Sequence, residues 1–145
     1  MHTFQNRLST FTAFAIVTAT VVVAAIPFAV NANAAQHQQS PGFHTISTEQ
    51  LAVSMIEKDF LLVNVHIPYE GEIERTDASI PFDKVEVSLD MLPADKDTPI
   101  VLYCRSGRMS QIAAAELAAL GYTDVSHLDG GMIEWEANGY SLIAK

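Results

Sequence analysis

Two short runs of apolar residues restrict the fold of this chain more than any other feature. Residues 60–67 (FLLVNVHI) and 99–103 (PIVLY) are almost continuously apolar and rich in valine and leucine. Runs of this length and composition are typical of strands buried on both faces, as in a parallel sheet covered by helices on each side. Because segments with helical spacing alternate with these runs, we expect an α/β fold.

The segments around the two apolar runs carry further helix and strand signals. Ser47 and Gln50 fit a capping box, which predicts a helix that runs to about Lys58. The other expected elements are a weak strand at 85–89, a helix with apolar positions from Met109 to Leu120, a strand at 123–128 and a helix at 132–138.

The composition excludes several classes of protein. Of the 145 residues, 49% are hydrophobic and 17% are charged, so the chain can bury a core and is not intrinsically disordered. The formal net charge of −9 argues against nucleic acid or an anionic membrane surface as a partner. Cys104 is the single cysteine, which excludes an intrachain disulfide and any CxxC metal or redox pair.

The N-terminal part differs in character from the rest of the chain. No Asp, Glu, Lys or Arg occurs between Arg7 and Glu49, and residues 11–30 are almost wholly apolar. The triplet Ala32-Asn33-Ala34 matches the A-x-A pattern of a signal-peptidase site, which admits only small side chains. We therefore expect a signal peptide at 1–34, a polar linker at 35–42 and one domain at 43–145.

Such a signal peptide implies that the domain is exported, to a periplasm or out of the cell, with no membrane attachment after cleavage. The alternative is an uncleaved N-terminal membrane anchor, because the apolar stretch at 11–30 is long enough to span a bilayer. Both interpretations place the domain outside the cytoplasm.

The strongest functional signal is Cys104, the first residue after the second apolar run. In open α/β sheets, ligands bind beyond the carboxyl ends of the strands, and a helix N-terminus favours an anion there. Arg105 and Arg108 add positive charge, and the small Ser106 and Gly107 allow the loop to curl round the sulfur. These features favour a nucleophilic thiolate. The alternative is a free cysteine packed as a small hydrophobe.

Three segments together resemble the rhodanese-like sulfurtransferases. CRSGRMS at 104–110 resembles the active-site loop of this family, and LVNVHIPYE at 62–70 looks like the segment that the family usually writes as LxDVRxxxE. VSHLDGGMIEWEANG at 125–139 is similar to its closing strand, Gly-Gly turn and Trp-bearing helix. The resemblance covers about residues 43–143 and implies a rhodanese-like fold, with a five-stranded, mainly parallel sheet flanked by helices on both faces.

The resemblance also implies a two-step sulfur transfer. The thiolate of Cys104 takes a sulfane sulfur from a small anionic donor such as thiosulfate, and an acceptor, cyanide or a thiol such as a protein thiol, removes it from the persulfide. No metal and no organic cofactor is implied. The residues that would form the anion cradle are Arg105, Ser106, Gly107, Arg108 and Met109.

The chain departs from the usual motifs of the family at several positions. It has Asn64 and His66 where relatives usually carry Asp and Arg, and Met109 where some members carry an arginine. Glu70 matches the glutamate of the family. We expect Asn64, His66 and Glu70 to support the site, Glu70 by anchoring the loop beside it.

Other functions match parts of this pattern. Cysteine phosphatases and arsenate reductases need an arginine at the sixth position after the cysteine, which is Ser110 here, so phosphoryl transfer is disfavoured. A persulfide carrier or partner-binding module with little turnover remains an alternative to an enzyme. His44, His66 and His127 lack the spacing of metal ligands and are expected to be hydrogen-bonded at strand ends. The acidic run at 70–77 is expected to be a solvated loop.

Overall fold

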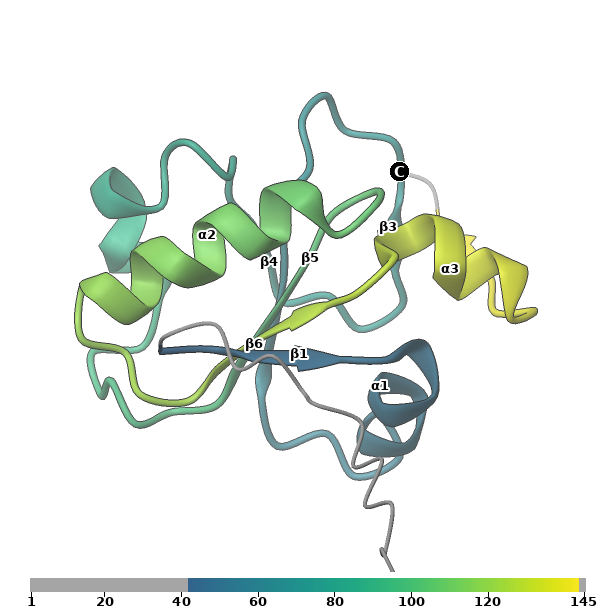
Figure 1. Ribbon diagram of the computed structural model, residues 1–145, viewed down its shortest axis with the longest axis horizontal. Helices are drawn as coiled ribbons and strands as arrows, with labels where there is room; N and C mark the ends of the chain where they lie inside the picture. Colours follow the sequence, from purple (N-terminus) through teal and green to yellow (C-terminus); the bar gives the residue numbers. More distant parts are fainter. Residues whose placement is uncertain (1–41, 144–145) are drawn as a thin grey trace, which may run out of the picture. The chain divides into compact units, whose positions relative to one another are not determined.

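A five-stranded parallel sheet forms the centre of the domain. The computed structural model describes residues 42–143, whose elements are shown in Figure 1. The sheet order is β1-β6-β5-β2-β4, and every neighbouring pair is parallel. The strands are β1 (His44–Ile46), β6 (Val125–Leu128), β5 (Ile100–Tyr103), β2 (Leu61–Asn64) and β4 (Ala78–Ser79). The expected five-stranded α/β architecture is therefore confirmed.

Helices cover both faces of this sheet. On one face lie α2 (Arg108–Ala119) and the 3₁₀ helix η1 (Glu86–Met91), and on the other lie α1 (Thr48–Ser54) and α3 (Gly131–Ala137) (Figure 1). A short antiparallel pair, β3 (Glu72–Ile73) with β7 (Leu142–Ile143), lies apart from the main sheet. Within residues 42–143, no helix is long and apolar enough to cross a membrane. The expected signal peptide and most of the linker lie outside the described residues.

Side chains alternate along β5, and this alternation decides where the cysteine lies. Leu102 and Cys104 belong to the apolar cluster under α2, whereas Val101 and Tyr103 belong to the cluster under α1 and α3. Both faces of the strand are thus apolar, which explains the continuous apolar run in the sequence. The same period of two directs Cys104 toward the helix that follows it.

Two expected elements differ in the structure. The capping box of Ser47 and Gln50 is confirmed, but α1 ends at Ser54 rather than near Lys58. The strand expected at 85–89 is wrong, because that segment forms η1. Its side chains do not alternate between core and solvent: Val85 is buried, but η1 itself contains no buried residue, so the segment has no apolar face with a period of two.

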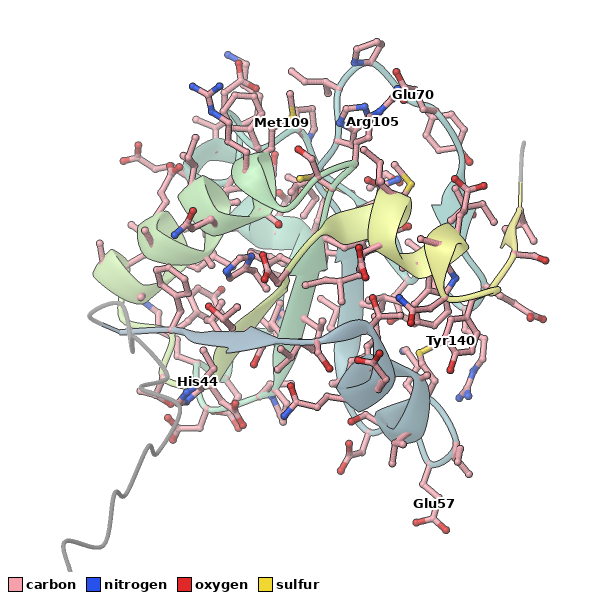
Figure 2. The ribbon with its side chains drawn as sticks, turned by 45° about the vertical axis from the view of Figure 1, so that its right-hand side comes forward. His44, Glu57, Glu70, Arg105, Met109 and Tyr140 are labelled. Atoms are coloured by element: carbon pink, nitrogen blue, oxygen red, sulfur yellow. The ribbon has the colours of Figure 1, made fainter. Side chains whose placement is uncertain are left out.

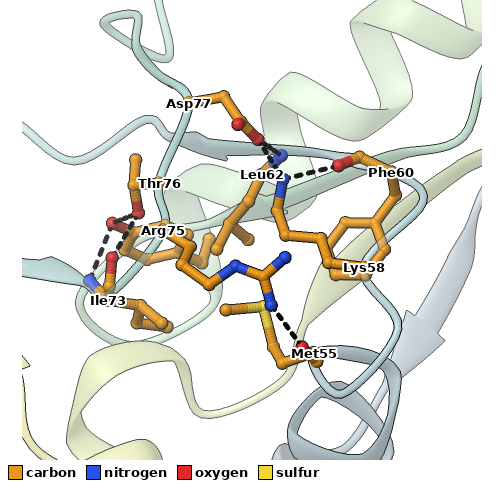
Figure 3. A network of polar contacts seen from close by, with 9 residues as sticks. Met55, Lys58, Phe60, Leu62, Ile73, Arg75, Thr76 and Asp77 are labelled. Atoms are coloured by element: carbon orange, nitrogen blue, oxygen red, sulfur yellow. Dashed lines mark hydrogen bonds and ion pairs between the residues drawn. The ribbon is translucent and has the colours of Figure 1, made fainter.

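Polar contacts hold the acidic segment after β3 against the domain (Figure 3). Asp77 accepts hydrogen bonds from the Leu62 amide (2.7 Å) and the Lys58 ammonium (2.5 Å), and Arg75 donates to the Met55 carbonyl. The hydroxyl of Tyr103 accepts from the Ile73 amide and contacts Thr76. Burial raises the pKa of Tyr103 to about 12. The expectation of a solvated loop at 70–77 is confirmed for Glu70, Glu74, Arg75 and Asp77, which are exposed, and is wrong for 71–73, which are buried.

Candidate active site

Cys104 lies directly beyond the carboxyl end of β5, where the chain leaves the sheet for α2. Its neighbour Tyr103 is still tied to the sheet, because the Val65 amide donates to its carbonyl (2.8 Å). Cys104 is 1% exposed and packs in the apolar cluster that contains Ala113 and Ala114 of α2. The nucleophile that the sequence indicated is therefore enclosed between the sheet and the helix.

The start of α3 fixes the backbone of the cysteine loop from the other side. The Met132 amide donates to the Cys104 carbonyl (2.9 Å), and the Ile133 amide donates to the Arg105 carbonyl (3.0 Å). Gly131 allows this close approach, because a Cβ there would lie 2.2 Å from the Cys104 carbonyl oxygen. The Gly-Gly turn noted in the sequence thus has a direct function: it lets α3 dock against the cysteine loop.

In the loop that follows Cys104, the carbonyls are engaged in hydrogen bonds with other described residues but the amides are not. The carbonyls of Cys104, Arg105 and Gly107 each accept a hydrogen bond. Among the described residues, no hydrogen-bond acceptor is found for the amide groups of residues 105–109. Gly107, with φ of +86°, is the N-cap of α2, whose first turn carries no acidic residue. Unengaged amides and an uncompensated positive helix end together favour an anion beside Cys104.

Arg105 is already engaged by a carboxylate. Its guanidinium forms an ion pair with Glu70, and the two side chains meet at the end of the domain shown in Figure 2. The same Glu70 oxygen lies 3.6 Å from Nε2 of His66, whose side chain is 8% exposed. Neither ring nitrogen of His66 has a hydrogen-bond partner among the described residues. The expectation that His66 is satisfied by hydrogen bonds is therefore wrong.

Asn64 stabilises the turn at 66–71, which carries Glu70. It is buried at the end of β2, its amide donates to the Gly71 carbonyl (3.0 Å), and its carbonyl accepts from the His66 backbone amide (3.0 Å). These two bonds join both ends of the segment that carries Glu70. The neutral amide can both donate and accept, so the uncharged residue satisfies this turn without an ionic partner.

The remaining residues of the expected cradle differ in exposure. Ser106 and Arg108 are exposed, Met109 is partly buried, and Gly107 is buried. Arg108 has no ion pair within the described part of the chain, in contrast to Arg105. Arg108 and Met109 belong to the first turn of α2, so the loop is shorter than the expected 105–109.

Ser110 occupies the position where a phosphatase loop would need arginine. It is buried, and its hydroxyl donates to the Gly107 carbonyl (3.0 Å). His127, on β6, contacts Ser110 and Thr45 and so has the hydrogen bonds that the sequence suggested. His44 is exposed on β1. Within residues 42–143, no three potential ligands among His, Cys, Asp and Glu are grouped so that they could hold a metal ion.

The sequence matches a known family over the segment that builds this site. The sequence model of the rhodanese-like domain matches residues 62–138. A protein named sulfurtransferase from Allochromatium vinosum is 36% identical over 68% of this chain and 94% of that protein. The thiosulfate sulfurtransferase GlpE from Pseudomonas syringae is also 36% identical, over 64% of this chain and 87% of that protein.

Solved structures share the fold of the described domain. A rhodanese-like domain protein from Staphylococcus aureus is 27% identical, with a TM-score of 0.59, and the match covers 70% of this chain and 97% of that one. A rhodanese-related protein from Thermoplasma volcanium, 23% identical with a TM-score of 0.60, covers 70% of this chain and 98% of that one. The chain therefore belongs to the rhodanese-like domain family and, at the level of that family, is a sulfurtransferase.

Proposed function

We propose that this protein transfers a sulfane sulfur from a small anionic donor, of the thiosulfate type, to a nucleophilic acceptor through a persulfide on Cys104. One observation carries the proposal. The only thiol of the chain lies at the start of a loop whose amides have no acceptor among the described residues and which leads into the N-terminus of α2. This arrangement stabilises an anionic sulfur, both before and after it receives a second sulfur atom.

In the first step, the Cys104 thiolate attacks the outer sulfur of thiosulfate. A new sulfur–sulfur bond forms on Cys104 while the sulfur–sulfur bond of the donor breaks, and sulfite leaves with the bonding electron pair. The negative charge moves onto the terminal sulfur of the persulfide. The amides of the loop after Cys104 donate to no acceptor among the described residues, so they are available to stabilise this charge in the transition state.

In the second step, cyanide or a thiolate attacks the terminal sulfur of the persulfide. The bond to Cys104 breaks, the electron pair returns to the cysteine sulfur, and the acceptor leaves as thiocyanate or as a new persulfide. The two steps need no oxidant and no cofactor. They regenerate the thiolate, so one cysteine is sufficient for turnover.

The charges around the site favour a small anionic donor. Arg108 is exposed and unpaired among the described residues, whereas Arg105 is shared with Glu70. Arg108 is therefore the stronger attractant for an anion in a chain whose formal net charge is −9. The burial of Cys104 favours a small donor over a bulky one. Relatives named thiosulfate sulfurtransferase support the same donor class.

A thiosulfate:cyanide assay on the purified protein tests this proposal. We expect thiocyanate release that depends on Cys104 and is abolished in Cys104→Ser, with Arg108→Ala as a variant that retains the nucleophile. If the folded, reduced protein releases no thiocyanate with cyanide and forms no persulfide, the proposed sulfur transfer through Cys104 is wrong. A stable persulfide without turnover would instead support the carrier alternative, in which a specific thiol is the acceptor.

We also propose that the protein is exported. The support comes from the sequence alone: the absence of charge from residue 8 to residue 48 and the A-x-A triplet at 32–34. Cell fractionation with N-terminal sequencing tests this proposal. Recovery of a mature chain that begins at Ala35 outside the cytoplasm would support cleavage. An intact chain in the membrane fraction would support the anchor, and a cytoplasmic chain would refute export.

A further inference from the structure

A chain of hydrogen bonds runs from the cysteine loop across the sheet to β1. Register places His127 of β6 beside Leu102 of β5, so His127 lies on the same face of the sheet as Cys104, which is two residues farther along. Ser110, in the first turn of α2, contacts both the loop and His127. The imidazole therefore reaches the cysteine loop through a single side chain.

The donors and acceptors in this chain have a fixed direction. The Ser110 hydroxyl has one hydrogen, which it donates to the Gly107 carbonyl (3.0 Å). Ser110 Oγ must then accept from Nδ1–H of His127, at 3.4 Å. With its proton on Nδ1, the neutral ring presents Nε2 as an acceptor, and the Thr45 hydroxyl donates to it (3.1 Å).

The surroundings keep the ring neutral and in place. His127 is buried, and Phe43 packs edge-on against it, with ring centroids 5.6 Å apart at 71°. Burial lowers the pKa of His127, which favours the neutral ring that this direction of hydrogen bonding requires. The nearby Asp129 carboxylate and an interaction with the Leu128 backbone act in the opposite sense but do not outweigh burial.

The peptide at Gly107 is where this chain of bonds acts on the site. Gly107 has a left-handed backbone, and a Cβ there would lie 3.1 Å from the Gly130 amide, so the loop has little room at this point. Its carbonyl accepts from both Ser110 Oγ and the Gln111 amide. The Gly107 carbonyl and the Arg108 amide belong to one planar peptide, so a contact that holds this carbonyl also fixes the direction of the Arg108 amide.

We propose that His127 is a positioning residue for the anion cradle: through Ser110 it holds the Gly107 peptide, and with it the Arg108 amide at the N-terminus of α2. This inference rests on the proposed role of Cys104 as nucleophile. No hydrogen bond joins His127 to Cys104 among the described residues. His127 sets the geometry in which the reacting sulfur is stabilised.

Two amide substitutions separate the hydrogen bonds of His127. His127→Asn places an amide donor where Nδ1 lies and keeps the bond to Ser110, whereas His127→Gln reaches the position of Nε2 and keeps only the bond to Thr45. Both lose the ring contact with Phe43. We expect kcat for sulfur transfer from thiosulfate to fall about tenfold in His127→Gln and less than about twofold in His127→Asn, with KM unchanged in both.

Alkylation of the single cysteine by iodoacetamide provides a readout that does not need sulfur transfer. We expect it to be slowed in the same order, with His127→Gln slower than His127→Asn. If the wild-type protein transfers no sulfur but this order holds, the proposed function fails and the positioning role stands. Equal rates in the two amide variants, at equal folded fractions, would overturn the positioning role.

Ser110→Ala keeps the proposal testable if His127→Gln does not fold. It removes the hydroxyl that joins His127 to the Gly107 carbonyl, so we expect the same reduction in kcat and in the alkylation rate. A Ser110→Ala variant with wild-type kcat and alkylation rate would overturn the proposal.

Discussion

Gly131 is the residue at which a single methyl group should do most damage to the site. A Cβ at this position would lie 2.2 Å from the carbonyl oxygen of Cys104 and 2.8 Å from that of Arg105. Ordinary van der Waals contact begins at 3.4 Å, so the Cys104 carbonyl and α3 must separate by 1.2 Å to accept alanine. Such a movement also breaks the hydrogen bonds from Met132 and Ile133.

The expected loss of stability follows from these contacts. Two backbone hydrogen bonds contribute about 2 kcal/mol together. Alanine at the φ of +56° that Gly131 adopts costs about 1 to 2 kcal/mol more. The free energy of unfolding should therefore fall by roughly 3 to 4 kcal/mol, and Tm by on the order of 20 °C. A displacement of about 1 Å at the nucleophile should lower kcat/KM of the folded fraction about 100-fold.

Gly139→Ala is the matched control. Gly139 also has a positive φ, of +87°, but a Cβ there meets nothing within 4 Å. Backbone strain alone should lower its stability by about 1 kcal/mol and leave kcat/KM unchanged. Urea unfolding and the thiosulfate:cyanide assay on both variants measure the difference. If Gly131→Ala behaves like Gly139→Ala in both measurements, the docking of α3 on the cysteine loop does not have the function derived for it.

Three further predictions concern charge. Arg108→Ala should raise KM for thiosulfate about fivefold with an unchanged Tm, since Arg108 has no ion pair within residues 42–143; an unchanged KM would contradict its role in donor binding. Glu70→Gln should lower that KM about twofold, because it releases Arg105 from its carboxylate; a raised KM would contradict this. Burial lowers the pKa of His127 below 6.5, so the folded protein binds a proton at His127 less readily than the unfolded chain does. The contribution of His127 to stability is therefore complete above about pH 6.5 and is lost as the pH falls toward the folded-state pKa. Urea unfolding between pH 7.5 and 5 should show that the free energy of unfolding falls less with pH in His127→Asn than in the wild-type protein. Equal falls in the two proteins would contradict the lowered pKa of His127.

The elements predicted correctly are those whose signal is local. The apolar runs gave β2 and β5, although β2 is shorter than the run at 60–67, and the helical spacing after Cys104 gave α2. The capping box located the start of α1 at Thr48. Each of these signals arises within a dozen residues, from burial or from hydrogen bonds between near neighbours.

The elements that were missed depend on distant partners. Strand β4 is the pair Ala78–Ser79, which carries no apolar run and pairs only with β2. Asp77 brings it there by binding the Leu62 amide, fifteen residues away in sequence. No spacing rule detects such a contact, and the expectation of five strands therefore came from the resemblance to a family rather than from periodicity.

The candidate site shows the same division. Cys104 and the helix after it follow from local sequence, but the pairing of Arg105 with Glu70 joins residues 35 apart and was not expected. His127 was interpreted only as a satisfied histidine at a strand end. A buried serine in the first turn of α2 links His127 to the loop. This link can be recognised only once β6 is known to lie beside β5.

The most direct test of the central claim is the intact mass of the reduced protein before and after one equivalent of thiosulfate. We expect a gain of about 32 Da, one sulfur atom, in the wild-type protein, its loss on addition of cyanide with release of thiocyanate, and no gain in Cys104→Ser. An unchanged mass in folded, reduced wild-type protein, or an equal gain in Cys104→Ser, would contradict the claim that Cys104 carries the transferred sulfur.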